Sequence, residues 1–224
     1  MINKLLNKID RLETKHLFFS IVGASILLAV WMQYIQHGWI NPDSVLYLEQ
    51  AERFAQSEWK TGFKIFQWPL YGLCIGLIHT LTSLPIQTAA QLLNMLFFGI
   101  ATASFLTLIK LAGGNNRTLF FGMLLLFSSL YIVGDVLEML MRDEGFWAFY
   151  LTALVYFIRY MQHGKVSDAI FWQVSIIVAT LFRIEAILFL LLLPLVTLYV
   201  KSSPSKDKTW FKEKIKQLLI AYSL

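Results

Sequence analysis

Long apolar runs dominate this sequence and limit what the chain can fold into. They cover residues 17–36, 68–84, 86–109, 118–134, 146–161 and 168–200. A helix that crosses a bilayer needs about 20 apolar residues, and most of these runs approach that length. At 57% hydrophobic residues, the 224-residue chain also carries more apolar surface than a soluble domain of its size can bury. We therefore expect an all-α fold, namely a polytopic integral membrane protein.

The run at residues 68–84 decides between two topologies, because it is short and mixed with polar residues and glycines. If it spans the bilayer, the basic loops at Lys110 and Arg159 lie outside, against the positive-inside rule. The C-terminal tail would also lie outside, unless residues 168–200 crossed the bilayer only once. A single crossing would place Arg183 near the bilayer centre. If it is an interfacial helix on the outer surface, every basic cluster faces the cytoplasm. The sequence favours this second arrangement, with about six transmembrane helices.

The favoured topology divides the chain into three parts. Residues 1–16 form a cytoplasmic N-terminus, and residues 17–200 form a transmembrane module with a long external loop at 37–85 that contains interfacial helices. Residues 201–224 form a basic cytoplasmic tail, in which we expect the truncated start of a further helix. The run at 168–200 becomes a hairpin. Acidic residues then gather on the external side: Asp43, Glu49, Glu52, Glu58, Asp135, Glu138, Asp143, Glu144 and Glu185.

Charge and cysteine content disfavour several classes of function. The net charge of +5 comes from short basic clusters between apolar runs, which is typical of topology signals rather than of a nucleic-acid-binding face. Cys74 is alone, so no intramolecular disulfide can form, and no His or Cys cluster predicts a metal site. A divalent ion held by carboxylate oxygens stays open. The runs at 86–109, 118–134 and 146–161 contain no Asp, Glu, Lys or Arg before Arg159, which disfavours a transporter or flippase.

The segment 41–54 resembles the first external motif of the GT-C glycosyltransferases, such as the protein mannosyltransferases and the aminoarabinose transferase that acts on lipid A. In that family, the first span leads into a long external loop with an acidic residue at its start, followed by Tyr and Ala at helical spacing. Asp43, Tyr47 and Ala51 match this pattern. Tyr47, Ala51 and Phe54 also share one helix face, which predicts a buried stripe.

Further elements follow in the family's order. The sequence Pro69-Leu70-Tyr71 matches a motif that opens an interfacial helix, and the basic loop at 110–117 contains glycines, as in the family. A second external acidic motif, Arg followed by Asp, is matched by Arg142-Asp143-Glu144. The resemblance covers roughly residues 15–200.

The resemblance implies an enzyme of the bacterial plasma (inner) membrane. It implies transfer of a hexose or pentose from an isoprenoid-phosphate donor, a membrane lipid, to an acceptor glycan, lipid or protein at the external face. An inactive or truncated transferase remnant and a non-catalytic membrane subunit are the alternatives.

The chemistry of that reaction assigns roles to charged residues. The anomeric carbon is already activated, so the site must orient an acceptor hydroxyl, remove its proton and neutralise the departing phosphate. Carboxylates and cations at the membrane surface meet this need. The expected catalytic residues are Asp43 and Asp143. The expected substrate-binding residues are Arg142, Glu144, Arg183, Glu185, Lys64 and Tyr71.

Each acidic candidate also has a structural interpretation. Asp43 or Ser44 is expected to cap the helix that starts near residue 42. Asp143 and Glu144 suit the first turn of a helix, where the dipole favours negative charge. The pair at 183–185 can equally be the solvated tip of the hairpin.

Overall fold

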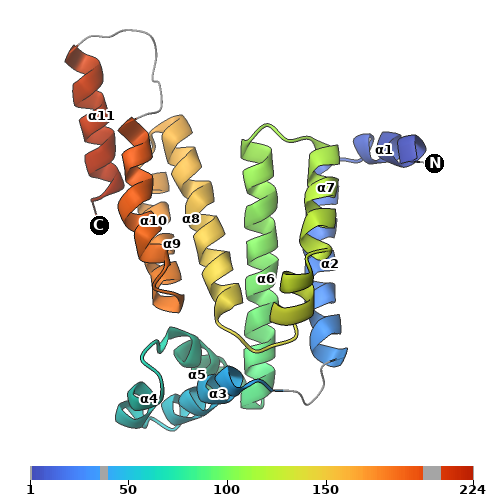
Figure 1. Ribbon diagram of the computed structural model, residues 1–224, viewed down its shortest axis with the longest axis vertical. Coiled ribbons are helices and arrows are strands. Elements are labelled where there is room, and N and C mark those ends of the chain that lie inside the picture. Colours follow the sequence, from blue (N-terminus) through green and yellow to red (C-terminus); the bar gives the residue numbers. More distant parts are fainter. Residues whose placement is uncertain (1, 36–39, 199–207, 224) are drawn as a thin grey trace.

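The computed structural model describes residues 2–35, 40–198 and 208–223, and every regular element in these ranges is a helix, as expected for an all-α chain. Six helices stand side by side as a bundle (Figure 1). They are α2 (Thr14–Ile35), α6 (Ile86–Leu111), α7 (Asn116–Phe127), α8 (Asp143–His163), α9 (Val166–Phe182) and α10 (Ala186–Leu192). The most extensive helix contacts join α8 to its neighbours α9 and α6.

Three shorter helices form a separate group across one end of the bundle (Figure 1). They are α3 (Pro42–Ala55), α4 (Trp59–Ile65) and α5 (Leu70–Thr82). Helices α3 and α5 approach closely at Gly76, where an added Cβ would lie 2.8 Å from the carbonyl oxygen of Ala51. Only glycine permits this approach, and α5 therefore lies against α3 instead of joining the bundle.

The buried stripe predicted for α3 is confirmed. Tyr47, Ala51 and Phe54 are all buried, and Tyr47 and Ala51 belong to a core that also includes Tyr71 and Ile75 of α5. Exposed acids occupy the opposite face of α3. The amphipathic pattern thus fixes which side of α3 faces the rest of the protein.

Consecutive helices of the bundle run in opposite directions, so their connections alternate between its two ends (Figure 1). We define the acidic end as residues 41–85, 128–142 and 183–185 with the first turn of α8. We define the basic end as residues 2–15, 110–117 and 159–168. Basic side chains of the latter are Lys4, Lys8, Arg11, Lys15, Lys110, Arg117, Arg159 and Lys165. Acidic side chains are therefore in excess at one end of the bundle and basic side chains at the other, although each end contains some of both.

The outward surfaces of the bundle are apolar. Leu27 of α2, Leu125 of α7 and Leu130 are 70%, 69% and 82% exposed. Two of the described helices, α2 and α6, are long and apolar enough to cross a membrane. Exposed apolar surface of this extent is unusual for a monomeric protein in water and is typical of contact with lipid.

The apolar run at 118–134 is not one helix, contrary to expectation. Helix α7 ends at Phe127, and a π-helical segment, η1 (Tyr131–Val136), follows after two serines. The hydroxyl of Ser129 accepts a hydrogen bond from the backbone N–H of Ile132 at 3.4 Å. Serine hydroxyls compete in this way for the backbone groups that would otherwise form helical hydrogen bonds. This competition explains why α7 ends at Phe127.

The described part of the run at 168–200, up to Leu198, forms the predicted hairpin. Helices α9 and α10 contact each other and are joined by residues 183–185, and the 3₁₀ segment η2 (Leu193–Leu198) continues α10. At Gly145 of α8, an added Cβ would come within 2.5 Å of the Phe182 ring, so glycine permits the close packing of α8 on α9.

A further helix lies in the C-terminal segment, as expected. Helix α11 (Lys208–Ala221) packs against α9 and η2 rather than standing apart from the bundle. Trp172 and Gln173 of α9 donate hydrogen bonds to the carbonyls of Ala221 and Ile220, at 3.3 and 2.7 Å. These bonds satisfy carbonyls at the end of α11. Residues 199–207, which include the first part of the predicted basic tail at 201–224, lie outside the described residues.

Candidate functional site

The start of α3 is fixed to the bundle by two side chains. Asn41 caps the helix, accepting a 2.6 Å hydrogen bond from the N–H of Ser44, and its amide contacts the sulfur of Met139. The Ser44 hydroxyl donates a 2.9 Å bond to the carbonyl of Leu140. The expected cap at Asp43 or Ser44 is therefore wrong, because Asn41 fills that position. Asp43 is left exposed in the first turn, with no hydrogen bond to a described residue.

Tyr47 lies one turn further along α3, at the centre of the acidic end. Its side chain is buried, and its ring packs edge-on against Phe66 and Tyr71, each with centroids 5.3 Å away. Burial raises the pKa of Tyr47. Four charged residues also shift this pKa, the two Asp residues upward and the two Arg residues downward. In order of effect they are Arg142, Asp43, Asp143 and Arg183. One of these charges has a direct structural link to Tyr47, because the Arg142 guanidinium lies 5.1 Å from the centroid of the Phe66 ring that packs on the Tyr47 ring.

Asp143 and Arg183 form an ion pair that joins α8 to the hairpin tip. Asp143 is buried, and its Oδ1 accepts a hydrogen bond from Nη1 of Arg183. The other terminal nitrogen of Arg183 contacts Glu185 at 2.8 Å. The hydrogen bond to Glu185 raises the pKa of Arg183, and the same bond lowers the pKa of Glu185. The three residues thus form a charged network in which Arg183 is neutralised on both sides.

Arg142 contributes a cation that is not neutralised in this way. Its guanidinium carbon lies 5.1 Å from the centroid of the Phe66 ring, a cation–π contact. Its Nη1 is buried and has no hydrogen-bond partner among the described residues. An Arg nitrogen without an acceptor is costly inside a protein, so this group is suited to an incoming anion.

A buried chain of hydrogen bonds lies behind these charges. The Tyr71 hydroxyl donates to Oδ1 of Asn94 on α6 at 2.7 Å, and the Asn94 amide donates to Oε1 of Glu144 at 3.1 Å. The same amide reaches the carbonyl of Met141 at 3.1 Å. Oε2 of Glu144 has no partner among the described residues. Asn94 therefore connects α5, α6, the segment before α8, and α8 itself.

The structure brings most of the expected site residues together. Asp143, Arg183 and Glu185 form one ion-pair network, Arg142 precedes Asp143 directly, and the start of α3 with Asp43 is bonded to the segment before α8. Two further groups, Tyr71 and Glu144, are fully buried behind them. Burial raises the pKa of Tyr71 well above its usual value, so its hydroxyl stays neutral. Lys64 differs from the rest, because it is exposed on α4 and contacts none of them.

Sequence reasoning missed Asn94 and assigned Tyr47 only to the buried stripe. Asn94 is an amide within a long apolar helix, and such a residue must find hydrogen-bond partners when buried. That signal was present in the sequence. The packing of Tyr47 against Phe66, beside the Arg142 guanidinium, could not be read from the sequence.

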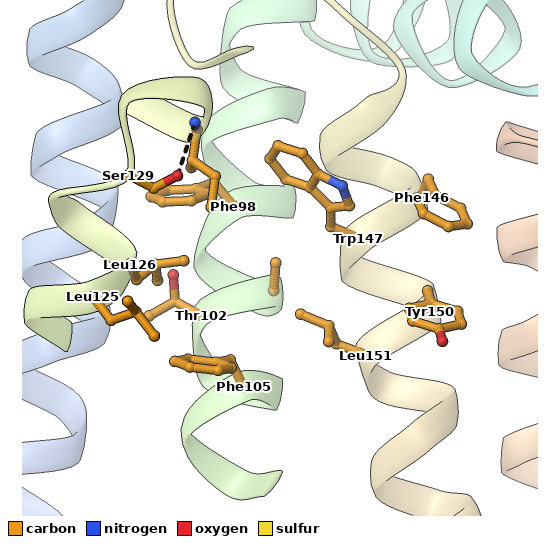
Figure 2. Close-up of a pocket in the computed structure, with 12 residues that line it drawn as sticks. Phe98, Thr102, Phe105, Leu125, Leu126, Ser129, Phe146, Trp147, Tyr150 and Leu151 are labelled. Atoms are coloured by element: carbon orange, nitrogen blue, oxygen red, sulfur yellow. Dashed lines mark hydrogen bonds between the residues drawn. The ribbon is translucent and has the colours of Figure 1, made fainter. Parts of the chain in front are cut away.

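An apolar cavity of about 490 Å³ opens between α6, the α7–η1 segment and α8 (Figure 2). Its walls include Phe98 and Phe105 of α6, Leu126 of α7, and Trp147 of α8. Phe146 also lines it, and the guanidinium of Arg183 lies 5.9 Å from the Phe146 ring. The cavity lies between the bundle helices, and none of its lining side chains is charged. Its volume is in the range of small-molecule sites.

Metal ligands do not gather in this region. Within residues 2–35, 40–198 and 208–223, no three His, Cys, Asp or Glu side chains are grouped so as to hold a metal ion.

Comparisons of the chain with protein-family models, with curated proteins and with solved structures find no match. Functional assignment therefore depends on the motifs of the sequence and the geometry of the acidic end.

Proposed function

We propose that the chain is a multi-pass membrane protein whose six bundle helices cross the bilayer, with the basic end in the cytoplasm. The lengths of α2 and α6, the apolar outward surfaces and the separation of charge between the two ends support this placement. Helices α3 to α5 then lie at the external interface. Helices α7, α9 and α10 are short for a full span. In this placement they stand nearly perpendicular to the membrane plane, or the bilayer thins locally around them.

We further propose that the protein is a GT-C type glycosyltransferase that uses a lipid-phosphate-linked sugar. The observation that carries this proposal is the contact between the start of α3, which holds Asp43, and the segment before α8, next to Arg142 and the Asp143–Arg183 ion pair. Two carboxylates and two guanidinium groups are the groups that this reaction requires, and they meet where a lipid headgroup would lie. The apolar cavity beside Phe146 has room for part of the isoprenoid chain.

In the proposed reaction, the exposed carboxylate of Asp43 takes the proton of the acceptor hydroxyl. The acceptor oxygen forms a bond to the anomeric carbon, while the bond from that carbon to the phosphate oxygen breaks. The electron pair leaves with the lipid phosphate, whose charge the partly exposed Arg142 side chain neutralises. Asp143 acts mainly by holding Arg183 beside the phosphate.

The remaining residues take supporting roles in this proposal. Glu185 orients Arg183 from the solvent side, and the chain from Tyr71 through Asn94 to Glu144 positions the start of α8. Lys64 is placed on the exposed surface of α4, where it can meet an acceptor or a headgroup but not the charges around Tyr47.

Purified protein in proteoliposomes should transfer sugar from a polyprenyl-phosphate donor. A panel of isoprenoid-phosphate hexoses and pentoses carrying a radiolabel, mixed with a total envelope extract as acceptor, should label one class of product. The product should form only with lipid-linked donors and not with nucleotide sugars. Absence of transfer from the whole panel would favour the inactive remnant or the non-catalytic subunit.

Single cysteines should report the topology. In a Cys74→Ser background, Lys60→Cys and Asp135→Cys at the acidic end should react with an impermeant maleimide added to intact cells. Ala112→Cys and Lys165→Cys at the basic end should react only after the membrane is opened. All four positions are exposed, so protection reports the side of the membrane rather than burial. Protection of residue 135 in intact cells would contradict the interfacial placement of α5.

A further inference from the structure

A second cavity lies at the basic end, far along the bundle from the charges around Tyr47. It is a groove of about 630 Å³ between the start of α2 and the end of α6. Its lining combines apolar and cationic groups: Lys15, Phe18, Phe19, Thr107, Lys110 and Leu111. Nothing in the proposed transfer reaction uses this groove.

Both lysines of the groove lack a counter-charge. Neither Lys15 nor Lys110 forms an ion pair with a described residue, and both are exposed. The nearby acids are engaged elsewhere, since Glu13 contacts His16 at 3.4 Å and Asp10 is paired with Arg117. Two ammonium groups therefore flank an apolar groove without an internal anion.

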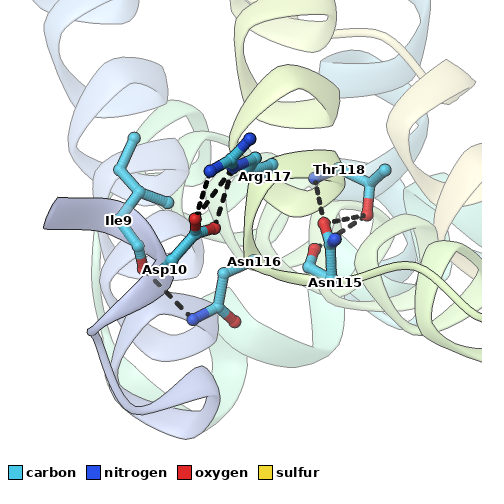
Figure 3. A network of polar contacts seen from close by, with 6 residues as sticks. All are labelled: Ile9, Asp10, Asn115, Asn116, Arg117 and Thr118. Atoms are coloured by element: carbon cyan, nitrogen blue, oxygen red, sulfur yellow. Dashed lines mark hydrogen bonds and ion pairs between the residues drawn. The ribbon is translucent and has the colours of Figure 1, made fainter. Parts of the chain in front are cut away.

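The amphipathic helix α1 (Ile2–Asp10) adds positive charge at the same end. Its C-terminal turn is fixed to the start of α7, because Arg117 binds the Asp10 carboxylate and the Asn116 amide donates to the carbonyl of Ile9 (Figure 3). Leu6 and Ile9 pack into the core between α1, α2 and α7, whereas Lys4 and Lys8 are exposed. This arrangement is typical of a helix that lies in the membrane interface.

We infer that the groove between α2 and α6 binds an anionic phospholipid. The phosphate would sit between the ammonium groups of Lys15 and Lys110, and an acyl chain would follow Phe18, Phe19 and Leu111 down the bundle. Basic pockets between membrane helices on the cytoplasmic side commonly hold such headgroups. The inference depends on the proposed membrane placement but not on the proposed transferase activity.

Native mass spectrometry of protein released from nanodiscs tests this inference. With equal amounts of phosphatidylglycerol and phosphatidylcholine, wild-type protein should retain phosphatidylglycerol preferentially. The Lys15→Gln/Lys110→Gln variant should lose about 30-fold in affinity for it, as expected for two lysine contacts with an anionic surface. The Lys15→Arg/Lys110→Arg variant should retain binding, which separates loss of charge from loss of fold.

The matched control is Lys8→Gln/Lys165→Gln, which removes the same charge from exposed sites of the basic end outside the groove. It should retain the bound phosphatidylglycerol. An equal loss in this control would overturn the inference, because general surface charge would then explain the binding. Competition by soluble glycerol phosphate would also overturn it, since a free phosphate rather than a lipid would be the ligand. Transferase activity is not measured in this experiment, so its outcome is independent of the proposed reaction.

Discussion

Replacing Asp43 by asparagine is expected to lower the rate of sugar transfer by roughly 10²- to 10⁴-fold, the usual contribution of general acid–base catalysis. Asparagine keeps the size of the side chain but cannot take the proton of the acceptor hydroxyl. The fold should change little, because Asn41 and not Asp43 caps α3. Loss of the favourable interaction of Asp43 with the helix dipole should destabilise the protein by about 0.3–1 kcal/mol at most. Initial rates at saturating donor, beside thermal unfolding in detergent, measure both effects.

Glu49→Gln provides the control for this experiment. Glu49 is an exposed acid on the same helix, and its contact with Arg53 is long, at 4.0 Å. Its neutralisation changes the charge of α3 equally but should leave the transfer rate within about twofold of wild type, because exposed pairs contribute little. Full activity of the Asp43→Asn protein would defeat the assignment of Asp43 as the base.

Replacing Arg183 by alanine is expected to destabilise the protein by about 3 kcal/mol. The buried carboxylate of Asp143 would lose its cation, and an unpaired buried charge is costly. The value is taken at the low end of the range for broken buried pairs, because the Arg183 side chain is 34% exposed. Unfolding by SDS in mixed micelles gives the free energy directly.

Two companion variants locate the origin of this loss. Asp143→Asn in the Arg183→Ala background should recover most of the stability, because no unpaired charge then remains in the interior. Glu185→Gln should lower the stability by less than about 1 kcal/mol, since the Glu185 side chain is 54% exposed. If the double variant were as unstable as Arg183→Ala alone, the ion pair would not be the cause.

The sequence predicted the fold where one physical signal dominated. The stripe of Tyr47, Ala51 and Phe54 follows from helical spacing, and the hairpin tip at 183–185 follows from charges inside a long apolar run. The expected helix over 118–134 failed because hydropathy does not distinguish a straight helix from one broken at Ser128 and Ser129. The serine hydroxyls competed there with backbone hydrogen bonds, and α7 ended.

The site was predictable in its composition but not in its pairing. Acidic and basic candidates could be chosen from their position near helix ends, and the start of α3 with Asp43 does contact the segment before Arg142 and Asp143. The Asp143–Arg183 pair depends instead on the packing of α8 against α9, which residue spacing does not encode. The role of Asn94 likewise appears only when α5, α6 and α8 are assembled around it.

The same ion pair has a consequence for the synthesis of the protein. Asp143 precedes Arg183 by 40 residues, so it leaves the ribosome well before its partner exists. At about 5–20 residues per second, the delay is roughly 2–8 s. Under the proposed membrane placement, α8 enters the bilayer during this interval with an unpaired carboxyl in its first turn. The arrival of Arg183 at the end of α9 then supplies the cation, so in that placement the order of insertion matters as well as the final contact.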